Sequence, residues 1–273
     1  MGALDLVDGW DAPEAAVGVV GGGGRGVLAV RGDRSRRSRW ASVTKLVSAL
    51  ATLVAVEEGT VDLDSPAGPP GSTLRHLLAH ASGLAFDEDR TLAQPGHRRI
   101  YSNAGFEALA EAVAEGTGMP FERYLGEAVL EPLGLDGTRL EGSPAAGLVG
   151  PLDDLLRLAA ELLEPTLVGE RTLRTATTVA FPGLSGVLPG LGRQEPMDWG
   201  LGFELRGDKS PHWTGDRNSP ETFGHFGGSG SFLWVDPHAD LACAGLVGRE
   251  FGPATARRWA ALSDAVLEEF SGP

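Results

Sequence analysis

The chain has 273 residues, of which 42% are hydrophobic, and a formal net charge of -14. This length and composition provide for a full hydrophobic core and exclude a disordered chain. The negative charge argues against nucleic acid or an anionic membrane as a partner, because both attract basic proteins, whereas a small-molecule substrate is compatible with it. A single cysteine, Cys243, excludes an intrachain disulfide framework, and its apolar surroundings predict a buried core position.

A β-hairpin is predicted near the start of the chain, where two short strands, 15–20 and 26–31, flank a run of glycines. The same glycines match the pattern G-x-G-x-x-G from Gly21 to Gly26. A dinucleotide site would need a helix after the last glycine and an acidic residue about 20 positions further on. Neither follows in this sequence, so a dinucleotide cofactor is not expected.

The middle of the chain is predicted to be helical. Apolar residues recur at helical spacing from Ser42 to Glu58, and Gly59 provides a stop signal, which indicates a mostly buried helix. Further helices are expected at 74–80, 104–115, 120–131 and 151–163. The segment 181–196 is rich in glycine and proline and is expected to form a mobile lip of a cleft.

Strand patterns return in the C-terminal part, at 201–206, 231–235 and 241–247, and a helix at 253–270 closes the chain. Strands at both ends with helices between them predict an α+β fold, in which one antiparallel sheet is built from both termini and an all-helical lobe is inserted. We expect a single domain, with an α/β lobe at about 1–60 and 196–273 and a helical lobe at about 61–195.

The location expected from the sequence is cytoplasmic. Residues 1–11 show no basic segment followed by an apolar one, as a secretory signal would have. No apolar run approaches the roughly 18 residues that a membrane-spanning helix needs.

Ser42 and Lys45 form the first candidate catalytic pair. Arginine outnumbers lysine by 21 to 2, so a lysine at position 45 suggests a function that arginine cannot perform. A lysine amine can become neutral and accept a proton, whereas a guanidinium stays charged. Positions three apart share a helical face, and the helix dipole and burial would both lower the lysine pKa. Alternatively, Ser42 is only a helix N-cap, although a capping box would place Glu or Gln at position 45.

Tyr101 and Asn103 form the second candidate pair, on a loop before a predicted helix. The charges of Arg98 and Arg99 could favour a phenolate and make Tyr101 a proton shuttle. A core tyrosine and an N-cap asparagine are the structural alternatives.

A third candidate element is the glycine-rich segment from Gly224 to Gly230, which contains His225. Glycines let the backbone approach a ligand closely and direct an N–H group at an oxyanion. The alternative is a glycine-rich strand or bulge in which His225 is simply a satisfied polar residue.

These stretches together resemble a known group of enzymes. Ser42-Val43-Thr44-Lys45, Tyr101-Ser102-Asn103 and His225-Phe226-Gly227 follow the order and approximate spacing of the three motifs of the serine β-lactamase and penicillin-binding protein superfamily. The class C β-lactamase branch, with its related esterases and D-amino-acid peptidases, is the most similar. Two further segments, 77–84 and 199–203, resemble the same branch.

The resemblance implies a β-lactamase/transpeptidase-like fold and a serine hydrolase that forms an acyl-enzyme. Ser42 would be the nucleophile, and Lys45 and Tyr101 would share its proton. The N–H groups of Ser42 and Gly228 would form the oxyanion hole. Substrate binding would fall to the motif residues Asn103, His225, Phe226 and Gly227. No metal or organic cofactor is implied.

Phe226 departs from the family pattern, because many relatives carry Thr or Ser there to help bind a substrate carboxylate. This difference favours esters or small amides over penicillin-like substrates. Two other functions of the same fold stay open: an acyltransferase, and a sensor that is acylated without turnover. The sequence suggests no particular oligomeric state.

Overall fold

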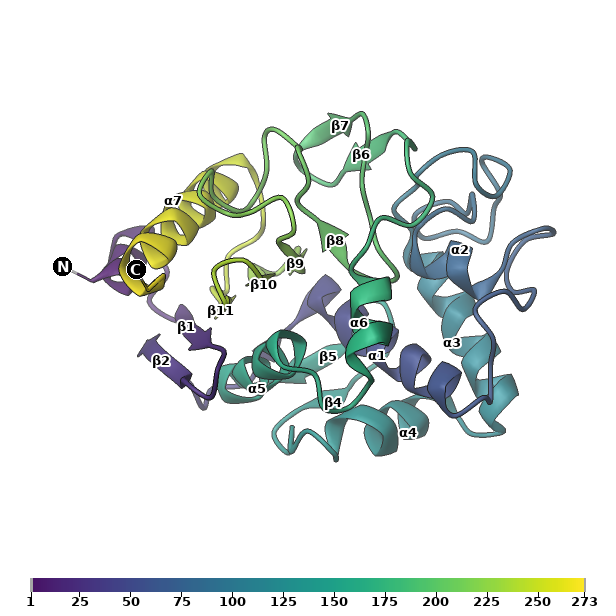
Figure 1. Ribbon diagram of the computed structural model, residues 1–273, viewed down its shortest axis with the longest axis horizontal. Helices are drawn as coiled ribbons and strands as arrows, with labels where there is room; N and C mark the ends of the chain where they lie inside the picture. Colours follow the sequence, from purple (N-terminus) through teal and green to yellow (C-terminus); the bar gives the residue numbers. More distant parts are fainter. Residues whose placement is uncertain (1, 273) are drawn as a thin grey trace.

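The computed structural model describes residues 2–272. Its centre is a six-stranded antiparallel sheet with the strand order β2-β1-β11-β10-β9-β8, so strands from both ends of the chain lie side by side (Figure 1). The α+β architecture expected from the sequence is therefore confirmed. The strands are β1 (Ala16–Gly21), β2 (Gly26–Arg31), β8 (Glu204–Leu205), β9 (Phe223–Gly227), β10 (Ser231–Asp236) and β11 (Leu241–Leu246).

Alternation along these strands divides the hydrophobic core between the two faces of the sheet. In β10, Phe232 and Trp234 pack on one face, while Leu233 and Val235 pack on the other. Cys243 of β11 lies in the first of these cores and is fully buried, as expected. The first face is covered by α7 (Pro253–Phe270) and the 3₁₀ helix η1 (Ala3–Trp10), which contact each other.

The second face is covered by α5 (Leu152–Leu163), which packs on β11, β1 and β10. This helix lies in the segment expected to form the helical lobe, yet it belongs to the packing of the sheet. The central helix α1 (Thr44–Glu57) begins with a 3₁₀ turn, η2 (Ala41–Val43), and contacts α3 and α4. Away from the sheet lie α2 (Leu74–Leu78), α3 (Asn103–Thr117), α4 (Phe121–Leu125) and a π-helical turn, η3 (Gly126–Leu130) (Figure 1).

Several elements differ from the sequence-based expectations. The glycine- and proline-rich segment contains a hairpin, β6 (Gly186–Leu188) and β7 (Gly192–Gln194), and a short helix, α6 (Glu170–Ala176), precedes it. A three-stranded sheet links β3 (Ser38–Arg39), β5 (Leu148–Gly150) and β4 (Arg139–Leu140). Gly186 forms a bridge with Arg99, so a contact distant in sequence anchors the hairpin.

Within residues 2–272, no helix combines the length and apolar character needed to span a bilayer.

Candidate active site

Ser42 lies in the 3₁₀ turn η2, just before α1, and is partly exposed. The preceding residue, Ala41, has a φ of 42°, a left-handed conformation that costs an L-residue about 1–2 kcal/mol. Gly227 packs directly on this turn: a Cβ at position 227 would come within 2.7 Å of the Trp40 carbonyl oxygen. Ser42 makes no capping hydrogen bond at the start of either helix, so the N-cap alternative is not supported.

Lys45 is fully buried in the first turn of α1. Its Nζ donates hydrogen bonds to Asn103 Oδ1 at 2.6 Å and to the Ala145 carbonyl oxygen at 3.0 Å. Burial lowers the pKa of Lys45 to about 7, although the carboxylates of Asp87 and Glu107 oppose this effect. A neutral amine has two N–H donors and one lone pair. With both donors engaged by uncharged acceptors, the lone pair is left available for a proton.

Tyr101 lies against Lys45, whose Nζ is 4.8 Å from the centre of the phenol ring. Burial raises the pKa of Tyr101, and the Ser42 side chain only partly offsets this. The expectation that Arg98 and Arg99 favour a phenolate is therefore wrong. The buried Arg99 guanidinium instead donates to main-chain carbonyls, including those of Met197 at 3.0 Å and Ala180 at 2.7 Å.

Asn103 is the first residue of α3, and its side chain is free for the site because Ser102 caps the helix. Ser102 Oγ accepts a hydrogen bond from the Gly105 N–H at 2.9 Å. Asn103 Nδ2 donates to Asp87 Oδ1 at 2.8 Å, while its Oδ1 accepts from Lys45. The N-cap alternative for Asn103 is thus excluded, and its amide links the buried lysine to a surface carboxylate.

His225 and Phe226 are neighbours in β9, but their side chains have different surroundings. His225 is buried with its ring centre 5.8 Å from that of Tyr101, and its Nδ1 donates to the Phe226 carbonyl oxygen at 2.7 Å. Burial and the nearby Lys45 lower the pKa of His225 to about 3, so this imidazole is neutral. The Phe226 ring packs against Phe251 and Trp213 and is 5% exposed, so it does not line the site.

Gly228 is exposed. It follows Gly227, the β9 residue that packs on Ala41, and this position brings the Gly228 backbone close to Ser42. A Cβ at position 228 would meet no atom within 4 Å. The expected oxyanion pair, the N–H groups of Ser42 and Gly228, therefore comes from two segments in direct contact. Ser231 Oγ strengthens this contact by donating to the Trp40 carbonyl oxygen at 2.5 Å.

Other residues of the site were not among the expected ones. His80 and Trp199 pack on Tyr101, with ring centres 4.6 Å and 5.8 Å from its own. His80 lies in the segment 77–84 and Trp199 in the segment 199–203, the two further segments that resemble the family. That resemblance was the sequence signal that could have identified them. The Ala145 carbonyl had no such signal, because any residue type supplies the same oxygen.

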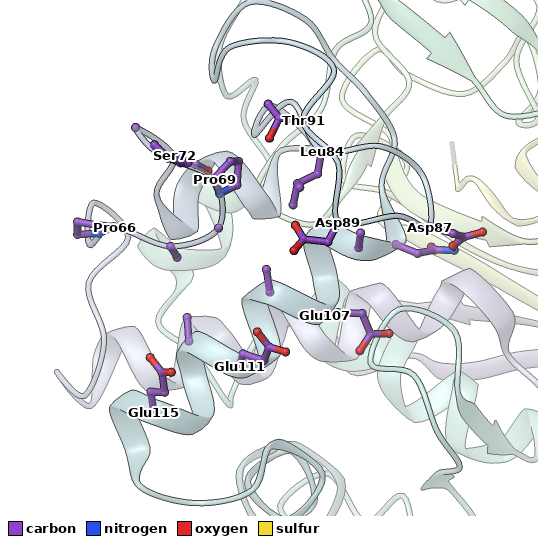
Figure 2. A pocket seen from close by; sticks show the side chains of 18 of the residues that line it. Pro66, Pro69, Ser72, Leu84, Asp87, Asp89, Thr91, Glu107, Glu111 and Glu115 are labelled. Carbon is purple, nitrogen blue, oxygen red and sulfur yellow. The ribbon is translucent and has the colours of Figure 1, made fainter.

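A groove of about 1080 Å³ opens beside Asn103 and runs along α3 (Figure 2). Its charged lining consists of carboxylates, those of Asp87, Asp89, Glu107, Glu111 and Glu115. Asp87 and Glu107, at the end near Lys45, are the two that oppose the lowering of its pKa. The groove therefore gives one side of the site a negative potential. Several arginines precede Ser42 in the sequence. Four of them form ion pairs with carboxylates, namely Arg31, Arg34, Arg36 and Arg37.

Comparison with known proteins decides the family. The sequence model described as "Beta-lactamase" matches residues 5–267. The chain belongs to the beta-lactamase family. The resemblance inferred from the three motifs is confirmed at this level, and the sheet and helices described above match a β-lactamase/transpeptidase fold.

Individual relatives of this beta-lactamase-family protein differ widely in similarity. A solved beta-lactamase from Mycobacterium bovis, Mb2281c, is 56% identical, with a TM-score of 0.96 over 99% of this chain and 100% of that one. The D-alanyl-D-alanine-carboxypeptidase/endopeptidase AmpH of Escherichia coli K12 is 28% identical over 143 residues, which cover 39% of this chain and 37% of AmpH. The chain thus aligns with well under half of that relative. Simvastatin synthase (LovD) of Aspergillus terreus shares the fold, with a TM-score of 0.83 and 17% identity over 98% of this chain and 97% of that one.

Proposed function

We propose that this protein is a serine hydrolase that cleaves an ester or amide through an acyl-enzyme on Ser42. The observation that carries the proposal is Lys45, a buried amine with a pKa of about 7, held by two uncharged acceptors one helical turn after Ser42. An amine in this state is half deprotonated near neutral pH, which suits a general base. Membership of the beta-lactamase family supports the same reaction class.

In the proposed first step, Ser42 Oγ attacks the substrate carbonyl carbon and its proton passes to Lys45 Nζ. The N–H groups of Ser42 and Gly228 stabilise the oxyanion, a contribution typically of about 3–4 kcal/mol. The tetrahedral intermediate then collapses, and the leaving group departs with a proton that originates from Ser42. In the second step, water attacks the acyl carbonyl carbon and loses a proton to neutral Lys45. The bond to Ser42 Oγ then breaks, and Lys45 returns the proton to Ser42 Oγ, which releases the acid and regenerates free Ser42.

We assign the base to Lys45 rather than Tyr101. Burial raises the pKa of Tyr101, so its phenol holds its proton at neutral pH and can act only as a donor or relay. Tyr101 interacts with the Ser42 hydroxyl and lies over Lys45, a position suited to passing a proton between them. The neutral His225 supports the Tyr101 ring without adding positive charge.

The proposed substrate class follows from the chemical groups around the site. Asn103 and the Gly227–Gly228 backbone would bind the substrate amide or ester, and the buried Phe226 supplies no group for a carboxylate. The carboxylates of the groove favour neutral or cationic substrates over anionic ones. D-aminoacyl peptides, which the name of AmpH suggests, are candidates together with β-lactams and simple esters. The cytoplasmic location stays a prediction.

The test compares the wild type with Ser42→Ala on a chromogenic cephalosporin, a nitrophenyl acetate and a D-alanyl-D-alanine peptide, with intact-mass measurement after each. Turnover and a transient adduct that both require Ser42 are expected for at least one substrate. A stable adduct without turnover would indicate a sensor, and transfer to an added alcohol in preference to water would indicate an acyltransferase. Absence of turnover and of any Ser42-dependent adduct would overturn the proposal.

A further inference from the structure

An apolar cavity of about 410 Å³, with a lining that shares no residue with the acidic groove, adjoins Tyr101. Five large hydrophobic side chains within residues 2–272 are markedly exposed, and three of them line this cavity: Phe86 at 50%, Leu92 at 48% and Val187 at 58%. Isolated exposed hydrophobic residues are ordinary, but a cluster of them around a cavity marks a binding surface. The cluster here shares Tyr101 with the proposed active site.

The cavity is held in shape by the main chain. The Phe86 carbonyl oxygen accepts hydrogen bonds from the N–H groups of Asn103, at 2.7 Å, and Ala104, at 3.1 Å, at the start of α3. The Phe86 ring therefore stays stacked near Tyr101, with ring centres 5.9 Å apart. Leu92 is fixed by its N–H, which donates to the Gly83 carbonyl oxygen at 2.8 Å.

The opposite wall is the β6 strand, which carries Val187. The Arg99 N–H donates to the Ser185 carbonyl oxygen at 3.0 Å, and a Cβ at Gly186 would lie 2.4 Å from the Arg99 carbonyl oxygen. Only glycine allows this close approach. Arg98 and Arg99 line the cavity as well. The Arg99 guanidinium is engaged by main-chain carbonyls, whereas Arg98 is exposed, so any positive charge offered to a ligand is that of Arg98.

We propose that this cavity, lined by Phe86, Leu92, Ile100, Tyr101 and Val187, binds an apolar group of the substrate. The inference rests on the proposed acyl-enzyme function and narrows its substrate class to esters or amides that carry a hydrophobic chain. Such a chain would cover side chains that water otherwise contacts, while the reacting carbonyl lies at Ser42 beyond Tyr101. The hydrophobic chain belongs either to the acyl group or to the leaving group, and the two produce different substrate preferences.

The experiment measures kcat/KM for two ester series. In the first series the acyl chain of a nitrophenyl ester grows from acetate through butanoate and hexanoate to octanoate. In the second series the acyl group stays acetyl, and the alcohol grows from ethyl to octyl. We expect a rise of about fourfold for each CH₂ that becomes buried, in one series, until the cavity is filled. The series that rises identifies which end of the substrate occupies the cavity.

Val187→Ser tests the cavity itself, and Val27→Ser is the matched control. Val27 is 46% exposed on β2, the edge strand of the main sheet, and lies outside the cavity. Val187→Ser should reduce the ratio of kcat/KM between the longest and the shortest ester of the series that rises, by about fivefold to tenfold. Val27→Ser should leave this ratio unchanged.

A binding measurement makes the result independent of turnover. Ser42→Ala is titrated with the shortest ester of each series and with the ester of each series that carries a six-carbon chain. In one series the six-carbon ester should bind at least about tenfold more tightly, an advantage that Val187→Ser reduces. Equal affinities within both series, or kcat/KM values that are flat along both series in an enzyme that hydrolyses acetate esters, would overturn this inference and leave the proposed function intact. Preferential binding of a six-carbon ester without any turnover or Ser42 adduct would support the cavity and overturn the proposed hydrolase.

Discussion

The two lysines of this chain, Lys45 and Lys209, are both buried but have different partners. Lys45 faces the amide oxygen of Asn103 and the carbonyl oxygen of Ala145, neither of which carries a net charge. Lys209 Nζ lies 2.6 Å from a carboxylate oxygen of Glu204, in a salt bridge whose two side chains are each 1% exposed. For Lys45, the lysine with uncharged partners, burial lowers the pKa to about 7.

The cluster around Lys209 favours the ionised form of Glu204. Burial by itself would raise the pKa of Glu204, but the charges of Lys209 and His212 together with their hydrogen bonds lower it to about 2. The Trp213 Nε1–H donates to the same carboxylate at 3.0 Å, and Lys209 also donates to the Asp198 carbonyl oxygen at 2.7 Å. The comparison teaches that the partners of a buried lysine bear on its chemistry. A carboxylate beside the amine favours the ammonium, whereas uncharged acceptors leave desolvation to favour the neutral amine.

The largest expected effect comes from Lys45→Arg. A guanidinium retains its proton, so the proposed base is lost while the positive charge is kept. We expect kcat/KM to fall by about 10²–10⁴-fold, the range typical for a general base. The matched control is Lys209→Met, measured on the folded fraction, which should keep kcat/KM within about twofold. An active Lys45→Arg enzyme would contradict the assignment of the base.

Lys209→Met should have its main effect on stability. Removing one member of a buried ion pair leaves Glu204 as an uncompensated buried charge, with a typical cost of about 3–5 kcal/mol in the free energy of unfolding. Urea denaturation followed by circular dichroism measures this loss. The double variant Lys209→Met/Glu204→Gln should recover part of it, because no buried carboxylate is then left unpaired. A single variant as stable as the wild type would show that the pair is not needed for the fold.

The pH dependence of the wild-type enzyme tests the lowered pKa of Lys45. Only the neutral form of Lys45 accepts the Ser42 proton, so kcat/KM should rise with pH and reach half its maximum near pH 7. His225 should contribute no step at mildly acidic pH, since its pKa is about 3. A stopped-flow or plate-based profile of kcat/KM from about pH 5 to 11 measures the midpoint. A midpoint near that of an ordinary lysine, about 10.4, would contradict the lowered pKa.

The smallest expected effect is a displacement of that midpoint by Glu107→Gln. The Glu107 carboxylate raises the pKa of Lys45, so its removal should move the midpoint to lower pH, by about 0.5 units. Glu115→Gln is the control, because Glu115 lines the far end of the same groove and is not among the groups that shift Lys45 (Figure 2). Equal displacements in both variants would indicate a general effect of surface charge.

Much of the fold follows from local patterns in the sequence. The N-terminal hairpin, the central helix after Ser42 and the C-terminal helix 253–270 all lie where periodicity and stop signals predict them. The strand expected at 201–206 is reduced to β8, because Gly202 has a φ of 92° and Trp199 bridges to Glu204 before the strand begins. The β6–β7 hairpin also escaped prediction, since its anchor is Arg99, which is distant in sequence.

The candidate site, like the fold, was only partly predictable from the sequence. The three motifs and the two supporting segments were sufficient to indicate the family and to bring Ser42, Lys45, Tyr101 and Asn103 together. Phe226 was expected to line the site and is instead buried in an aromatic cluster, because alternation in β9 directs neighbouring side chains to opposite faces. Whether these residues perform the proposed steps is decided by the variants above.

The sequence by itself determined the chemical capacity of the site: a serine, a lysine where arginine is the rule, a tyrosine and an asparagine, at family spacing. Only the tertiary structure decided their protonation. The pKa of Lys45 depends on its burial and on acceptors 58 and 100 residues away in the chain, and that of Tyr101 rises for the same physical reason. Desolvation disfavours whichever form is charged, so it prepares the lysine to accept a proton and leaves the tyrosine to keep its own.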